Sequence, residues 1–193
     1  MILAAGTSSR LGEPKQLLEL GGRPLPQHAV DAAVEAGLEE VIVVLGHAAD
    51  EVAAALRLPE GVRIVVNPDF ESGQASSLRA GLRELSAECR AAVILLADQP
   101  GISFETVRGV ADAYREGAGP VVQVTYGNRP SHPVLVDRQL WPQLEAVEGD
   151  VGARDLLAEH PEWVTVVEVG GKPPPDVDTW EDYWRLAGEG PTG

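Results

Sequence analysis

Short runs of apolar residues alternate with longer amphipathic segments along the chain. The apolar runs are rich in valine, isoleucine and leucine, and they predict six strands, at residues 1–4, 41–45, 62–66, 92–97, 121–125 and 164–169. Several runs are apolar at successive positions, which is typical of strands covered by helices on both faces. The alternation predicts βαβ units and a mostly parallel sheet.

Apolar positions between these runs recur with the spacing of helices. Residues 27–36 carry one such stripe, and Gly37 follows it as a stop signal. Two further helices are predicted from the stripes Leu78, Leu82 and Leu85, and Val107, Val110, Ala111 and Tyr114. A last helix begins at Thr179, because the spacing from Thr179 to Asp182 matches a capping box.

Turn-forming residues separate the predicted elements. Residues 127–133 and the proline-rich tract at residues 170–175 are both expected to be loops. A chain of 193 residues is long enough to bury one hydrophobic core. We therefore expect a single α/β domain with three layers (α/β/α) over residues 1–187, followed by a flexible tail at residues 188–193.

The charge of the chain limits its partners. The formal net charge is −15 at pH 7, with 30 acidic residues against 15 lysines and arginines. Nucleic acids and anionic membranes bind clustered lysine and arginine, so neither is an expected partner. A phosphorylated small molecule remains compatible with this charge if a few cations, or a metal ion, are concentrated at one site.

The cysteine content and the apolar runs bear on the compartment. Cys89 is the only cysteine, so no disulfide is expected within the chain. No signal peptide is recognisable, and no apolar run approaches the ~20 residues of a membrane-spanning helix. These features favour the cytoplasm.

The first candidate site is the segment after the first predicted strand. Gly6 and Gly12 allow close backbone approach to a phosphate, and Arg10 and Lys15 can neutralise triphosphate charge. The glycine spacing fits neither the dinucleotide fingerprint nor the P-loop. An ordinary surface turn with solvated cations is the alternative reading of these residues.

The second candidate is Asp98, which follows the apolar strand at residues 92–97. Open parallel sheets place their ligands at the carboxyl ends of strands. A single carboxylate there suits Mg²⁺, which usually takes one or two protein carboxylates together with phosphates and water. The alternative is an aspartate that caps a turn, since Asp-x-Pro is common turn chemistry.

Together the two segments resemble a known family. The sequence LAAGTSSRLGEPKQLL at residues 3–18, followed by LLADQP at residues 95–100, is similar to the MobA/MocA-like NTP transferases, typified by molybdenum cofactor cytidylyltransferases and their guanylyltransferase relatives. Residues 67–78, 132–134, 149–154 and 176–179 match landmarks of that family in its order. The resemblance spans nearly the whole chain and implies a nucleotide-diphospho-sugar transferase-like (Rossmann-like) fold.

The resemblance also implies roles for the matching residues. Arg10 and Lys15 would bind the triphosphate and, with Asp98, form the catalytic group, while Asp98 and Asp178 would hold Mg²⁺. The residues implied at the base and ribose are Leu3, Ala4, Ala5, Gly6, Gly73, Ser76 and Ser77, with Ser77 opening its helix. His132 lies in the predicted loop at residues 127–133, where contact with the acceptor and simple loop packing are both open.

The activity implied by the resemblance is transfer of CMP from CTP to a molybdopterin-type cofactor, with a molybdoenzyme as recipient of the product. The Ala-Ala-Gly opening at residues 4–6 and the aspartate at position 178 resemble the cytidylyl branch, so CTP is favoured over GTP. Related reactions on a sugar phosphate or a methylerythritol phosphate are alternatives, because similar sheets serve them too. A non-catalytic chaperone for the finished cofactor is the alternative from another class.

Overall fold

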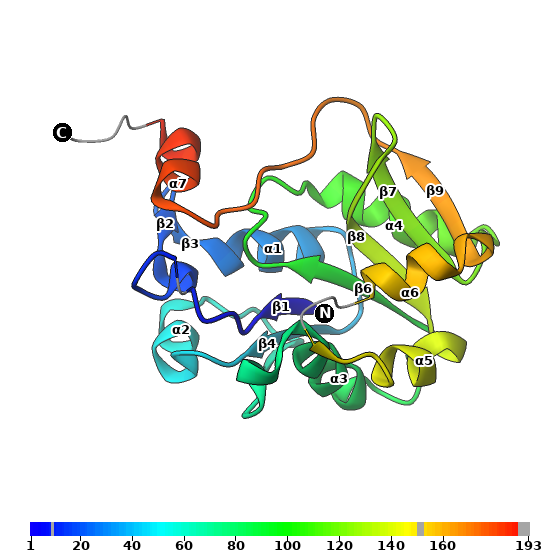
Figure 1. The fold of residues 1–193 in the computed structure, drawn as a ribbon, viewed down its shortest axis with the longest axis horizontal. Coiled ribbons are helices and arrows are strands. Elements are labelled where there is room, and N and C mark those ends of the chain that lie inside the picture. The colour runs from blue at the N-terminus through cyan, green and yellow to red at the C-terminus, as the bar shows by residue number, and fades with distance from the viewer. Residues whose placement is uncertain (9, 150–152, 189–193) are drawn as a thin grey trace.

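The structure is a computed structural model that describes residues 1–8, 10–149 and 153–188. Within them, a seven-stranded sheet has the order β5-β4-β1-β6-β8-β7-β9 (Figure 1). Its strands are β1 (Ile2–Ala4), β4 (Val41–Leu45), β5 (Val62–Val66), β6 (Ala91–Leu96), β7 (Val121–Tyr126), β8 (Arg129–Asp137) and β9 (Val164–Glu168). All neighbouring pairs are parallel except the two made by β8. The expectation of a mostly parallel sheet is confirmed.

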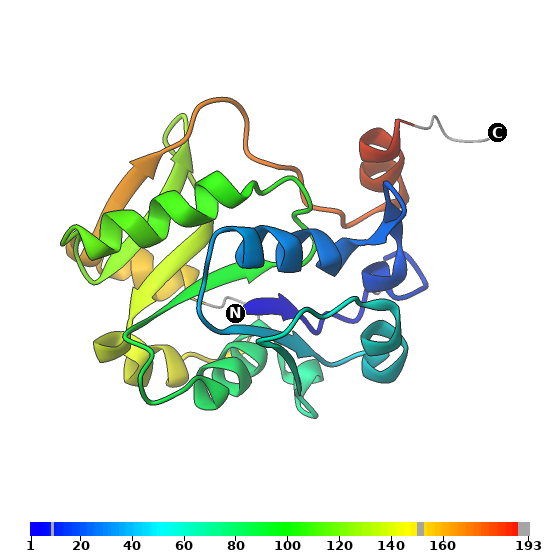
Figure 2. The same cartoon turned by 180° about the vertical axis from the view of Figure 1, so that it is seen from behind.

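Helices cover both faces of this sheet, as Figures 1 and 2 show from opposite sides. One face packs against α1 (Leu25–Glu35), α2 (Ala49–Ala55) and α4 (Phe104–Arg115). The other packs against α3 (Gln74–Glu84), α5 (Trp141–Glu145) and α6 (Arg154–Glu159). Successive residues of β4 alternate between the two apolar layers, because side chains of a strand point to opposite faces. This is the expected three-layer α/β/α arrangement.

Two smaller elements lie beside the end of the sheet. The hairpin of β2 (Glu19–Leu20) and β3 (Arg23–Pro24) leads into α1, and α7 (Trp180–Ala187) lies against it. The Tyr183 hydroxyl donates a hydrogen bond to the Glu19 carbonyl at 2.7 Å. Thr179 caps α7 through the predicted capping box with Asp182.

The predicted strands lie within one residue of the observed ones, but the loop expected at residues 127–133 is wrong. Only Gly127 and Asn128 form a turn, and β8 begins at Arg129. Both turn residues have positive φ, as a tight hairpin requires. The pairing register with β7 shifts between Gln123 and Val124, so these consecutive residues pair with Val134 and Ser131. Such an irregularity accommodates proline within a strand, and the prolines had indicated a loop in the sequence.

The start of α3 also differs from the expectation. The helix begins at Gln74, one residue after Gly73, so Ser77 lies inside its first turn and does not open it. Gly73 has φ 106°, a conformation that favours glycine. The backbone thereby turns directly into the helix.

Some expectations fall outside the described residues. They concern Ser9 in the first motif, Asp150, Val151 and Gly152 in the motif at residues 149–154, and residues 189–193 of the tail. In the parts of the chain that the structure covers, no helix combines the length and apolarity that crossing a membrane requires.

Gly46 lies where the sheet packs closely against residues of the candidate site. It follows β4, and a Cβ built on it would lie 2.5 Å from Phe70 Cβ and 2.9 Å from Ala5 Cβ. We expect Gly46→Ala to lower the free energy of unfolding by about 1–3 kcal/mol, since overpacking forces neighbours to shift. Chemical denaturation measures this change.

Gly109→Ala in α4 is the matched control. A Cβ at Gly109 meets nothing within 4 Å, so this variant should be unchanged or slightly more stable, as a helical alanine is favoured over glycine. Equal stability of the two variants would contradict the packing argument.

Candidate functional site

The first loop, defined here as residues 5–14, leaves β1 at the end of the sheet where β6 also ends. Leu3 pairs with Leu96 in parallel register, and the Ala97 amide donates to the Leu3 carbonyl at 3.1 Å. Asp98 therefore lies beside the start of the first loop, as the rule for carboxyl ends of parallel strands predicts.

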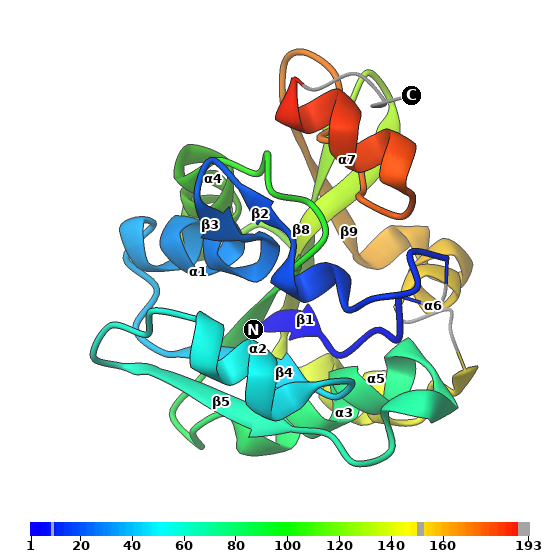
Figure 3. The ribbon, with the colours of Figure 1, turned by 90° about the vertical axis from the view of Figure 1, so that its left-hand side faces the viewer.

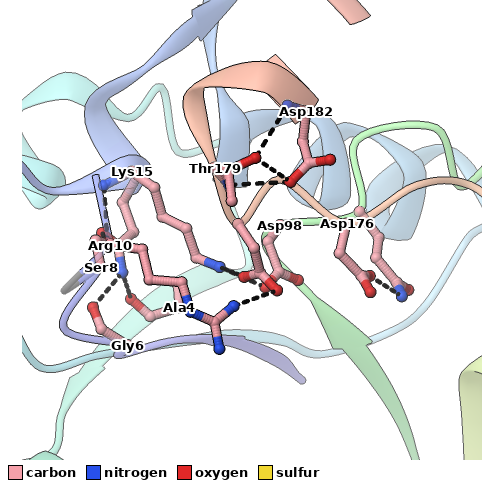
Figure 4. A network of polar contacts seen from close by, with 12 residues as sticks. Ala4, Gly6, Ser8, Arg10, Lys15, Asp98, Asp176, Thr179 and Asp182 are labelled. Atoms are coloured by element: carbon pink, nitrogen blue, oxygen red, sulfur yellow. Dashed lines mark hydrogen bonds and ion pairs between the residues drawn. The ribbon is translucent and has the colours of Figure 1, made fainter. Parts of the chain in front are cut away.

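Gln16 holds the first loop in shape. Its side chain is 2% exposed and donates to the carbonyls of Ala4 at 3.0 Å and Gly6 at 2.8 Å (Figure 4). The Ser8 hydroxyl donates to Gln16 Oε1 at 3.3 Å and accepts from the Lys15 amide at 2.9 Å. These bonds fold the loop back so that Lys15 returns to the strand end.

Lys15 joins two carboxylates that are far apart in the sequence. Its Nζ lies 2.7 Å from Asp98 Oδ2 and 2.9 Å from Asp178 Oδ1. Desolvation lowers the pKa of Lys15, but the two carboxylates outweigh it, and the net pKa is raised. Lys15 therefore stays protonated. Arg10 Nη1 adds a weaker contact to Asp178 Oδ2 at 3.5 Å and is mostly exposed (Figure 4).

Asp178 is brought to this cluster by the C-terminal strap, defined here as residues 169–179 between β9 and α7. The Val177 amide donates to the Asp98 carbonyl at 2.9 Å, and the Val177 side chain is fully buried. Gln99 Nε2 donates to Asp176 Oδ1 at 2.6 Å. The strap is thus fastened to the residues directly after β6.

Asp176 is a further acidic group of this cluster. Burial raises its pKa first, and the negative charges of Asp98 and Asp178 add to this, while the bond from Gln99 opposes it. The sequence motif at residues 176–179 contained Asp176, but no role was expected for it.

A cavity of about 290 Å³ opens between the first loop and the N-terminal end of α3. The expected residues that line it are Leu3, Ala4, Ala5, Gly6, Lys15, Gly73, Ser77 and Asp98. Sequence reasoning assigned no site role to the other lining residues, among them Gln16, Phe70, Glu71 and Gln74. These four residues lie within the recognised motifs at residues 3–18 and 67–78. Membership of those motifs is the sequence signal that points to them.

Four expected site residues do not line this cavity. Ser76 turns its hydroxyl into a hydrogen-bonded network with Asn67 Nδ2 and the Asp69 and Gly73 carbonyls. Asp178 is bonded to Lys15, which lines the cavity, and Arg10 contacts Asp178. The hydrogen bonds of Ser76 therefore stabilise the start of α3.

His132 is the fourth, and it lies on β8 in a second cavity of about 130 Å³. The two cavities share Leu3 and Gln74 in their linings. Burial lowers the pKa of His132 to about 4, so its imidazole is neutral near pH 7. His132 can exchange neutral hydrogen bonds with a ligand but offers no positive charge to a phosphate.

The carboxylates suit a hard divalent cation. Asp98 Oδ2 and Asp178 Oδ1 converge on one ammonium group, and Asp98 Oδ1 is buried without a hydrogen-bond partner. In the described part of the chain no group of three or more His, Cys, Asp or Glu residues could hold a metal on its own. A metal held here would need ligands from water and a phosphorylated substrate, which is how Mg²⁺ is usually bound.

A Rossmann-like sheet with a glycine-bearing loop, a lysine and paired carboxylates at its strand ends is typical of a nucleotidyltransferase. The family model of the MobA-like NTP transferase domain matches residues 1–164, so the chain belongs to this family. This confirms the family indicated by the sequence motifs.

Two curated proteins resemble the chain over 96% and 65% of its length. Nicotine blue oxidoreductase of Paenarthrobacter nicotinovorans is 36% identical over 197 residues, covering 96% of this chain and 94% of that protein. The bifunctional protein GlmU of Sorangium cellulosum is 37% identical over 135 residues, and the matched part is only 28% of that protein.

Solved structures share the fold. Rv0371c of Mycobacterium tuberculosis H37Rv is 34% identical with a TM-score of 0.86, covering 97% of this chain and 95% of that one. A complex of Rv0371C with manganese gives a TM-score of 0.83 at 32% identity, with 97% and 96% covered. A nucleotidyl transferase of Methanothermobacter thermautotroptrophicus is 27% identical with a TM-score of 0.80, with 97% and 94% covered.

The two hydrogen bonds from Gln16 to the Ala4 and Gly6 carbonyls, called here the Gln16 clamp, can be tested without a substrate. Gln16→Leu removes both bonds to the loop carbonyls, so we expect a loss of about 1–3 kcal/mol in unfolding free energy, the usual cost of unpaired buried polar groups. Gln143→Leu, at an exposed position of α5, is the control and should be near neutral. A thermal melt that shows both variants unchanged would contradict the clamp.

Proposed function

We propose that this chain transfers CMP from CTP to the terminal phosphate of a molybdopterin-type cofactor, with Mg²⁺ as the metal and pyrophosphate as the second product. The observation that carries the proposal is the convergence of Lys15, Asp98 and Asp178 at the mouth of the first loop. The manganese complex of Rv0371C, a structural relative, supports use of a divalent metal in this fold.

The reaction needs alignment and charge neutralisation more than acid–base catalysis. An oxygen of the acceptor phosphate attacks the α-phosphorus, and the bond from that phosphorus to the bridging oxygen of pyrophosphate breaks. The acceptor phosphate is already largely ionised near pH 7, so no covalent enzyme intermediate or strong base is required.

The residues around the first loop fit these needs. Lys15 and Arg10 would pair with the triphosphate, and the small residues at positions 4–6 leave room for the backbone to approach it. Asp98 and Asp178 would hold the metal, which supplies further positive charge at the phosphoryl oxygens. The site thereby concentrates cations within a chain whose net charge is −15.

The start of α3 supports a base-binding role beside this phosphate site. Ser77 lines the cavity, and its hydroxyl is held by Asn67 Nδ2 at 3.1 Å. Gly73 and Gln74, at the start of α3, line the same cavity. A fixed hydroxyl can help select a base by hydrogen bonding, and we propose cytosine as that base.

The second cavity supports an acceptor site on the β8 side. Since His132 is neutral, it would contact an uncharged part of the acceptor while the acceptor phosphate points toward the first cavity. The product would then pass to a molybdoenzyme.

A second candidate function follows from the nicotine blue oxidoreductase, which matches 96% of the chain. A redox reaction on a small organic compound would use the same cavities without needing paired carboxylates. The two functions differ in what they release, since only nucleotidyl transfer yields pyrophosphate.

A substrate panel tests the proposal. Purified protein is incubated with Mg²⁺, each of CTP, GTP, ATP and UTP, and either a molybdopterin-type cofactor, a sugar phosphate or methylerythritol phosphate. We expect pyrophosphate release chiefly with CTP and the molybdopterin-type cofactor. Release with another pair would overturn the assigned substrates, and cofactor binding without release would favour the chaperone. A redox change of nicotine blue, with no release of pyrophosphate, would establish the second candidate.

Single substitutions test the residues. Lys15→Ala and Asp98→Ala should each lower CTP turnover about a hundredfold or more, because a preorganised charge contributes roughly 2.7–4 kcal/mol to transition-state stabilisation. Lys172→Ala and Asp112→Ala remove the same charges at exposed positions and should keep normal rates. Circular dichroism checks that all four variants are folded, and near-normal turnover in either site variant would refute its assignment.

A further inference from the structure

We propose that Lys15 determines the specificity of the site for metal bound together with nucleotide, by competing with free divalent metal for Asp98 and Asp178. This inference rests on the proposed function, because it concerns the same metal–nucleotide site. It assigns to Lys15 a role in addition to contact with the triphosphate.

The geometry shows that one cation already uses both carboxylates. Lys15 Nζ lies within hydrogen-bond distance of Asp98 Oδ2 and Asp178 Oδ1, at 2.7 and 2.9 Å. A metal ion that binds the same two oxygens must displace the ammonium group from them. Metal and ammonium are therefore alternative partners of the pair.

The displaced ammonium needs a new anion. The Lys15 side chain is only 15% exposed, and a charge that has lost most of its water is costly unless it is paired. Arg10 contacts Asp178 at 3.5 Å, so it adds a second cation to the pair and does not relieve Lys15. The third carboxylate of the cluster, Asp176, is already bonded to Gln99.

A nucleotide supplies that anion at the right place. Lys15 and Asp98 both line the cavity of the first loop, so a triphosphate bound there can take over the ammonium as the metal takes the carboxylates. Free metal brings no such replacement. Binding of metal and nucleotide is then coupled, and each raises the affinity for the other by the same factor.

Because of this coupling, the site has a low affinity for divalent metal in the absence of nucleotide. The paired lysine also offsets the mutual repulsion of Asp98 and Asp178. The same side chain would thus pair with the carboxylates before metal and nucleotide bind, and with the triphosphate afterwards.

Mn²⁺ binding to the full chain without nucleotide tests this inference. Free Mn²⁺ is measured by electron paramagnetic resonance in 0.15 M salt, which screens the general attraction of an acidic protein. Removing the competing charge should raise Mn²⁺ affinity about tenfold or more in Lys15→Met, since a lost ion pair of this kind is worth at least about one decade in binding. Lys15→Gln, whose amide can still bond to the carboxylates, should show the same increase.

Two lysine variants control for charge. Lys15→Arg keeps a cation beside the pair and should bind Mn²⁺ as weakly as the native protein. Lys172→Met removes the only other lysine of the chain, at an exposed position of the strap, and should also leave Mn²⁺ affinity unchanged. An increase in Lys172→Met as large as in Lys15→Met would overturn the inference, because net charge alone would then explain it.

Asp98→Asn separates this inference from the proposed function. If Asp98→Asn abolishes Mn²⁺ binding in the presence of CTP, while Lys15→Met and Lys15→Gln bind free Mn²⁺ no more tightly than the native protein, the competition is refuted and the proposed site stands. If Asp98→Asn leaves Mn²⁺ binding unchanged with CTP present, the metal site lies elsewhere and the proposed function itself fails.

Discussion

The ion pairs of Lys15 with Asp98 and Asp178 are the constraint on which the site depends. They join three segments separated by 83 and 163 residues in the sequence. Asp98 is fixed by β6, whereas Lys15 arrives on a loop shaped by Gln16, and Asp178 arrives on a strap held by Val177. A largely buried ammonium is stable only with its counter-charges in place, so the loop and the strap each stabilise the position of the other. The supporting hydrogen bonds make this arrangement specific.

The sequence predicted the sheet well because buried parallel strands are apolar at successive residues and are separated by helical crossovers. It missed β8 because two prolines and a shifted register hide the strand, although Gly127 and Asn128 carried a hairpin signal. Lys15 and Asp98 were predictable from strand ends and from the family resemblance. The clamp made by Gln16 was not, since a glutamine gives no local sign of which distant carbonyls it will meet. Ser76 matched its motif, yet its hydroxyl points into the protein, a direction that only the three-dimensional packing determines.

A protein with a net negative charge can bind an anionic substrate only where its electrostatic potential is locally positive. We call this a local reversal of the potential. Under the proposed function, this reversal would use only two of the chain's 15 lysines and arginines. The positive charge would come from Lys15 and Arg10, beside the small residues of the first loop, and from a divalent cation held by the carboxylates. A charge partly withdrawn from water acts more strongly than an exposed one, so few groups suffice.

The strap shows that the candidate site extends beyond the segment that the family model matches. That segment ends at residue 164, and Asp178 lies beyond it. The strap reaches the sheet at the loop directly after Asp98, where a Cβ on Gly101 would lie 3.2 Å from Pro174 Cβ and where Gln99 binds Asp176. Because the strap docks on Asp98 and Gln99 through backbone and side-chain hydrogen bonds, the position of Asp178 depends on the same strand end that positions Asp98.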